Sequence, residues 1–102
     1  MVYKLPDNVS LRDAAAIEPV SCAVHGLDLL KLRPYQKALV IGDGFMGQIF
    51  AQLLQAYGVH QVDLAGIFDE KLQRNKEQFG VTETYNTTRE QIPADSYDVI
   101  VE

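Results

Sequence analysis

Residues 38–47 read Ala-Leu-Val-Ile-Gly-Asp-Gly-Phe-Met-Gly, and they carry the strongest structural signal in the sequence. Four apolar residues of strand character lead directly into glycines at positions 42, 44 and 47, and an apolar helical pattern begins immediately afterwards. A G-x-G-x-x-G motif in this strand–turn–helix context is typical of a dinucleotide-binding turn. The alternative is a glycine turn in an unrelated α/β protein, and the strand before and the helix after both count against it.

The three glycines each have a specific use in such a turn. Gly42 permits the tight turn out of the strand, Gly44 lets a pyrophosphate approach the backbone, and Gly47 lets the helix pack closely against the sheet. The helix starts near Phe45 and Met46, and its first N–H groups and positive dipole end are available to phosphate oxygens. The sequence therefore predicts that positions 42, 44, 45, 46 and 47 bind a dinucleotide.

The composition argues against several other classes of partner. A chain of 102 residues forms at most one domain, and its net charge of -5 argues against nucleic acid or an anionic membrane. No apolar run approaches the roughly 20 residues of a membrane span. A single cysteine excludes an internal disulfide. With only one cysteine and two widely spaced histidines, a self-contained zinc site is not expected. We therefore expect a cytoplasmic protein that binds neither nucleic acid nor membrane.

Apolar periodicity and breaker residues divide the chain into alternating helices and strands. A capping box over Ser10–Asp13 starts a short helix. A second helix has Pro19 in its first turn, after a break at Glu18, and ends before Pro34. The helix after the glycines has one apolar face and stops at Gly58. The remaining expected elements are strands at 37–41, 61–66, 82–85 and 97–101, and helices at 69–79 and 88–92.

This alternation predicts an α/β fold: a Rossmann-type parallel sheet with flanking helices. About four strands are expected where a complete dinucleotide fold has six, so the sheet is expected to be truncated. We interpret residues 1–34 as a helical connection from a missing catalytic domain. Residues 35–102 are then the N-terminal part of a dinucleotide-binding domain.

The chain resembles the zinc-dependent medium-chain dehydrogenase/reductase family, especially its polyol (sorbitol-type) branch. The resemblance implies an enzyme whose missing catalytic domain holds most of the zinc ligands. That enzyme would transfer hydride between a secondary alcohol or polyol and NAD(P), and would be a homo-oligomer at full length. The similar segments are Lys4-Leu5-Pro6-Asp7-Asn8-Val9-Ser10, Ala16-Ile17-Glu18-Pro19-Val20-Ser21, His25, Val40 to Gly47, and Lys71-Leu72.

By this resemblance, two residues of the second helix belong to the active site. Glu18 matches a glutamate beside the catalytic zinc, as a ligand or as a partner of the zinc-bound water, and a carboxylate suits either task. Its alternative role is a helix N-cap ahead of Pro19. Cys22 matches a position whose small side chain backs the nicotinamide, and its alternative is a buried apolar residue. His25 is expected to be a packing residue, and His60 is expected to lie on the surface.

The end of the second strand departs from the family. NAD-using relatives place there an acidic residue that hydrogen-bonds the ribose 2′-OH, whereas this chain has Gly66. The missing carboxylate removes repulsion against a 2′-phosphate, and Lys71 and Arg74 add positive charge nearby. Asp69 is expected to cap the next helix instead. The sequence therefore favours NADP over NAD.

Three other functions are compatible with parts of this pattern. The nearest is a zinc-free NADPH reductase of the same superfamily, because the deciding zinc ligands lie outside this chain. A non-catalytic nucleotide-sensing module is disfavoured by the Ile17-Glu18-Pro19 segment, and an S-adenosylmethionine-dependent transferase by Gly66. Asp63, in an otherwise apolar strand, has no explanation from the sequence.

Overall fold

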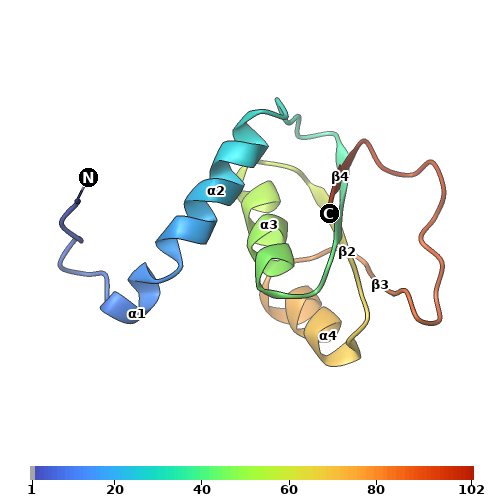
Figure 1. Cartoon of the computed structure of the whole chain (residues 1–102). Helices are drawn as coiled ribbons and strands as arrows, with labels where there is room; N and C mark the ends of the chain where they lie inside the picture. The colour runs from blue at the N-terminus through green and yellow to red at the C-terminus, as the bar shows by residue number, and fades with distance from the viewer. Residues whose placement is uncertain (1) are drawn as a thin grey trace.

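A computed structural model describes residues 2–102 as a parallel four-stranded sheet with helices packed against it (Figure 1). Strand β1 is central and pairs with β2 on one side and with β4 on the other, in the order β3-β2-β1-β4. The elements are α1 (Leu11–Ala14), α2 (Ile17–Asp28), β1 (Lys37–Ile41), α3 (Phe45–Ala56), β2 (Gln61–Gly66), α4 (Asp69–Gln78), β3 (Thr84–Asn86) and β4 (Val99–Val101). This order is half of the doubly wound arrangement, so the predicted fold class is confirmed.

Helices α3 and α4 cover one face of the sheet and enclose the core between them and the strands (Figure 1). The apolar β1 and β2 are buried because a parallel sheet is covered rather than left facing water. Gly58, with φ of +94°, ends the α3 region in the left-handed conformation, as expected. The buried core cluster comprises Leu27, Ala38, Val40, Ala51, Leu54, Val59, Val62, Leu64, Leu72 and Val81.

Helix α2 packs on α3 through its buried Ala23 and Leu27. The Tyr57 hydroxyl at the end of α3 donates to Asp28 Oδ1 over 2.6 Å, which raises the pKa of Tyr57. The boundaries of α2 differ from those expected. The helix begins at Ile17, two residues before Pro19, and ends at Asp28 rather than near Pro34. A left-handed residue at Lys31, with φ of 49°, follows this early end.

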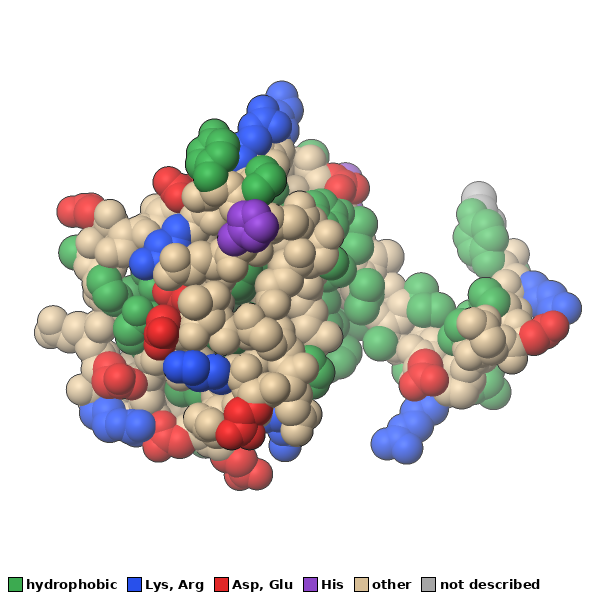
Figure 2. All heavy atoms as spheres, turned by 180° about the vertical axis from the view of Figure 1, so that it is seen from behind, with side chains coloured by type: hydrophobic (Ala, Val, Ile, Leu, Met, Phe, Trp, Pro, Cys, Tyr) green, Lys and Arg blue, Asp and Glu red, His purple; other side chains and the backbone are tan. Residues whose placement is uncertain are grey.

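The segment before α2 extends away from the body of the protein (Figure 1), and Figure 2 shows it from behind as a separate arm. The N-cap at Ser10 is confirmed, because Ser10 Oγ accepts from Asp13 N over 3.0 Å, but the Asp13 carboxylate accepts from the Ser10 hydroxyl rather than from the backbone N–H that a capping box uses. The arm exposes Val2 and Leu11 almost completely, at 96% and 84%. No helix within residues 2–102 is long and apolar enough to cross a membrane.

The prediction of a helix at 88–92 is wrong, because residues 87–89 form a turn. The side chain of Asn86 accepts from the backbone N–H of Thr88 over 3.0 Å and from its hydroxyl over 2.6 Å. Such local bonds offer the backbone an alternative to a helix. Strands β3 and β4 each begin two residues later than expected, at Thr84 and Val99.

The fully buried Asp63 is satisfied by partners that lie far away in the sequence. Its carboxylate accepts from the Tyr97 hydroxyl over 2.7 Å and from Glu83 N over 3.1 Å. Burial, reinforced by the bond to Asp63, raises the pKa of Tyr97 above its ordinary value. A buried carboxylate is therefore tolerated because protein donors replace water.

His60 is exposed as expected, whereas His25 is exposed rather than packed.

Candidate nucleotide-binding site

The glycine loop lies at the carboxyl end of the central strand β1, where parallel sheets of this order bind ligands. Gly42 has φ of +123°, a conformation that favours glycine, and its N–H donates to Ala65 O over 2.8 Å. A Cβ at Gly47 would overlap the Gly42 carbonyl oxygen. The structure therefore shows the close approach of helix and turn that the motif predicts.

The start of α3 is open to a ligand. Gly44 is the N-cap and has no side-chain hydrogen bond, and its carbonyl accepts from Gln48 N over 3.0 Å. The N–H groups of Phe45, Met46 and Gly47 therefore have no partner inside the helix. A Cβ at Gly44 would meet no atom within 4 Å, so this side of the loop is free space.

Two clefts flank the loop at the carboxyl ends of the strands. One runs from the glycine loop toward the end of β4, and the other runs between the ends of β1 and β2. An elongated dinucleotide with its pyrophosphate at the α3 N-terminus fits this arrangement. The first cleft is lined by residues that include Gly44, Met46, Phe50 and Val101, and the second by residues that include Ile41, Asp43, Gly66 and Thr87.

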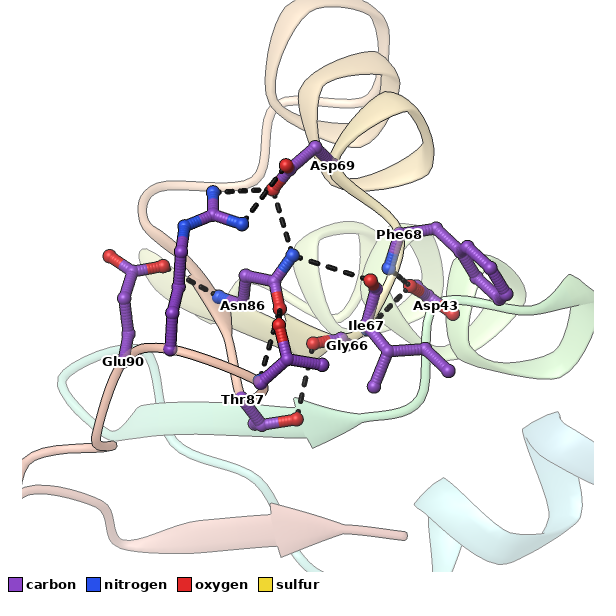
Figure 3. A network of polar contacts seen from close by, with 10 residues as sticks. Asp43, Gly66, Ile67, Phe68, Asp69, Asn86, Thr87 and Glu90 are labelled. Atoms are coloured by element: carbon purple, nitrogen blue, oxygen red, sulfur yellow. Dashed lines mark hydrogen bonds and ion pairs between the residues drawn. The ribbon is translucent and has the colours of Figure 1, made fainter.

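Asp43, which sequence reasoning passed over, connects the glycine loop to the start of α4 (Figure 3). Its Oδ2 accepts from Ile67 N over 2.8 Å and from Phe68 N over 2.7 Å. The side chain also lies against Gly66, where an added Cβ would come within 2.5 Å of Asp43 Cβ and Cγ. The glycine at position 66 therefore accommodates the aspartate at position 43. No local signal could have shown this, because the two residues lie 23 positions apart.

Lys71 and Arg74, which sequence reasoning singled out, line a cleft together with Asp43. Both are exposed, and Lys71 Nζ lies 4.7 Å from the centre of the Phe68 ring. Their positive charges thus share a cleft with the Asp43 carboxylate, which was not expected there. The buried Asn75 lines the same cleft, and within residues 2–102 its Oδ1 lacks a hydrogen-bond donor.

Asp69 does not cap α4, which corrects the sequence-based expectation. The N-cap is Phe68, and the Asp69 carboxylate is turned toward the loop after β3 (Figure 3). There it accepts from Arg89, at 2.6 and 3.0 Å, and from Asn86 Nδ2 at 2.9 Å. These two donors hold the pKa of Asp69 below its ordinary value.

Glu18 and Cys22 lie one turn apart on α2, and both are exposed. The Cys22 thiol donates to Glu18 Oε1 over 3.2 Å, which raises the pKa of the thiol. Neither alternative role holds in this chain, because the N-cap of α2 is Ala16 and Cys22 is not buried. In residues 2–102 no three potential metal-binding side chains come together. The described residues alone therefore do not form a zinc site.

The parallel sheet, its strand order and the glycine loop define the first half of a Rossmann-type nucleotide-binding domain. The chain belongs to the zinc-type medium-chain dehydrogenase/reductase family, in its polyol dehydrogenase-like branch. It is 38% identical to sorbitol dehydrogenase 1 of Saccharomyces cerevisiae over 88 residues, which cover 86% of this chain and 24% of that protein. The chain thus spans about a quarter of the length of the curated relatives it matches. No protein-family model matches the chain.

Solved structures support the same assignment. The alcohol dehydrogenase RspB of Escherichia coli CFT073, complexed with NADH, matches with a TM-score of 0.77 and 30% identity over 85% of this chain and 26% of that chain. S. aureus TarJ in complex with NADPH matches with a TM-score of 0.78 and 25% identity over 94% of this chain and 30% of that chain. Structures with this fold therefore include complexes with either nicotinamide dinucleotide.

Proposed function

We propose that the full-length protein containing this chain is an NAD(P)-dependent, zinc-type polyol or alcohol dehydrogenase. It transfers hydride between a secondary alcohol and the cofactor, and this chain supplies part of the cofactor-binding domain. The observation that carries the proposal is the glycine loop, in which α3 approaches the Gly42 carbonyl too closely for any side chain at Gly47. The similarity to sorbitol dehydrogenase supports the substrate class.

The residues of the loop have distinct proposed tasks. The N–H groups of Phe45, Met46 and Gly47 bind the pyrophosphate, and the bare backbone of Gly44 lets it approach. Cys22 backs the nicotinamide ring. When bound, the cofactor supplies a hydride acceptor or donor, and the protein fixes its orientation.

The adenosine end of the cofactor is proposed to lie near the end of β2. Gly66 borders the adenosine ribose, and Lys71 follows in the first turn of α4. Which dinucleotide these residues select depends on the charged side chains beside them.

Glu18 is proposed to support a zinc ion held mainly by another part of the protein, either as a ligand or through a bound water. Residues 1–34 are proposed as the connection to that catalytic part. Their exposed apolar side chains, such as Val2, Leu11 and Ile17, support this, because a partner domain would cover them. We further propose a cytoplasmic homo-oligomer, with a single cysteine suited to a reducing compartment.

The test is turnover by the purified full-length protein with a panel of polyols and secondary alcohols, followed by NAD(P)H absorbance, alongside its zinc content. We expect oxidation of at least one polyol that is lost on chelation and restored by zinc. Activity unaffected by complete zinc removal would instead support a zinc-free reductase. Binding of a dinucleotide without any turnover would support a sensing module.

A further inference from the structure

The Asp43 side chain fills the space that a side chain at Gly66, the last residue of β2, would need (Figure 3). The Asp43 side chain packs on the Gly66 backbone, at 2.5 Å from where the Gly66 Cβ would be. A carboxylate is therefore present at this place although the strand itself ends in glycine. It enters from the glycine loop, and it precludes a second side chain from β2.

The carboxylate also occupies the anion site that the start of α4 offers. Two successive N–H groups, of Ile67 and Phe68, both donate to Asp43 Oδ2. A helix N-terminus with free N–H groups attracts an anion, and here an internal one already takes those donors. Within residues 2–102, the second oxygen, Oδ1, accepts no protein hydrogen bond. It is available to a hydroxyl of a bound molecule.

Asp43 lies between two clefts and borders both. On one side is the cleft between the ends of β1 and β2, which it shares with Gly66 and Thr87. On the other side is the cleft that it shares with Lys71 and Arg74. A ribose in the first cleft would direct its 2′ substituent toward Asp43, and a 2′-phosphate would have to pass this carboxylate to reach the two cations.

The Asp43 carboxylate is buried, whereas the two cations on α4 are exposed to solvent. Lys71 and Arg74 are exposed, so solvent and salt screen their attraction for a phosphate. Asp43 is only 9% exposed and is held by two backbone donors, so it cannot turn away without leaving both unpaired. Its repulsion of a phosphate at short range is correspondingly less screened.

We propose that Asp43 takes the place of the acidic residue absent from the end of β2, hydrogen-bonds the ribose 2′-OH and makes the site prefer NAD(H) over NADP(H). This inference rests on the proposed function. It is opposite to the preference expected from Gly66 and Lys71 alone, because that expectation assumed that no carboxylate was present at this place.

The test is fluorescence titration of the full-length protein with NADH and with NADPH, for wild type and Asp43→Asn. We expect wild type to bind NADH about 10–100-fold more tightly, the range of one hydrogen bond to a charged group. Asp43→Asn keeps the shape and removes the charge, so that ratio should fall by a similar factor, mainly through tighter NADPH binding. Glu70→Gln is the control, since it removes one exposed carboxylate from the first turn of α4, next to Lys71, and should leave the ratio unchanged.

A second variant keeps the test valid if Asp43→Asn folds poorly. Asp43→Gly combined with Gly66→Asp moves the carboxylate from the loop to the strand and should retain the NADH preference. Tighter binding of NADPH by wild type, or an unchanged ratio in Asp43→Asn, would overturn the inference while leaving the proposed function intact. Binding of neither dinucleotide would overturn both.

Discussion

Replacing Gly47 by alanine tests the close contact on which the loop depends. In the structure the added Cβ would overlap the Gly42 carbonyl oxygen, a backbone atom rather than the end of a flexible side chain. The turn cannot easily yield, because Gly42 N is bonded to Ala65 O over 2.8 Å and Gly42 has φ of +123°. The helix must therefore move away from the sheet, or the turn must lose its bond to β2.

The expected magnitude combines two opposing effects. Overpacking costs about 1–3 kcal/mol. Alanine regains up to about 1 kcal/mol of helix propensity over glycine. Because the overlapped atom is a backbone oxygen, the upper half of the overpacking range applies, about 2–3 kcal/mol, and we therefore expect Gly47→Ala to lower the free energy of unfolding by about 1–2 kcal/mol.

Gly26→Ala in α2 is the matched control, because a Cβ there meets no atom within 4 Å. Only the propensity term remains at this position, so it should raise the free energy of unfolding by about 0.5–1 kcal/mol. The assay is urea unfolding of the chain followed by far-ultraviolet circular dichroism. If Gly47→Ala is as stable as wild type while Gly26→Ala gains stability, the close-contact reasoning is wrong.

Two further predictions concern other parts of the chain. Glu18→Ala in the full-length protein should lower zinc content or turnover by about 10–100-fold, which is the range for groups that support metal ligands. The unfolding midpoint should change little. A loss of stability with unchanged activity per folded molecule would show that Glu18 is structural. Tyr97→Phe leaves the buried Asp63 without one donor and should cost about 1–3 kcal/mol in urea unfolding at pH 7. The raised pKa of folded Tyr97 stabilises the fold below the unfolded pKa of about 10, and this contribution is lost as pH rises further. The difference between wild type and Tyr97→Phe should therefore shrink above about pH 10, and a constant difference from pH 7 to pH 11 would contradict this account.

The central elements could be predicted because their signals are local. The strands expected at 37–41 and 61–66 coincide with β1 and β2, since each is a short, mainly apolar segment followed by a glycine turn or a helix start. The helix after the glycine turn follows from its apolar face and ends before Gly58. The glycine loop was recognisable because motif, strand and helix agree over ten consecutive residues.

Two carboxylates could not be interpreted from the sequence because each is bonded to a distant segment. Asp69 has the position of a helix cap, yet it binds Arg89, which lies 20 residues further along the chain. Asp63 is explained by its donors Glu83 N and the Tyr97 hydroxyl, which lie 20 and 34 residues away. The overlap of Asp43 with Gly66 joins two positions 23 residues apart, so the carboxylate beside Gly66 could not be inferred from the local sequence. Such pairings appear only once the strands are side by side.

The most direct test of the central claim is the binding of nicotinamide dinucleotides by Gly44→Ala. Gly44 has ordinary extended torsions, φ of -83° and ψ of -168°, and open space where its Cβ would lie, so alanine should leave the fold unchanged. A methyl group there would block the approach of the pyrophosphate to the α3 N-terminus.

We therefore expect the full-length variant to melt at the wild-type temperature and to bind NADH and NADPH at least about 10-fold more weakly, a loss of about 1.4 kcal/mol or more. Unchanged affinity for both dinucleotides in a folded Gly44→Ala protein would contradict the assignment of the glycine loop as the cofactor site.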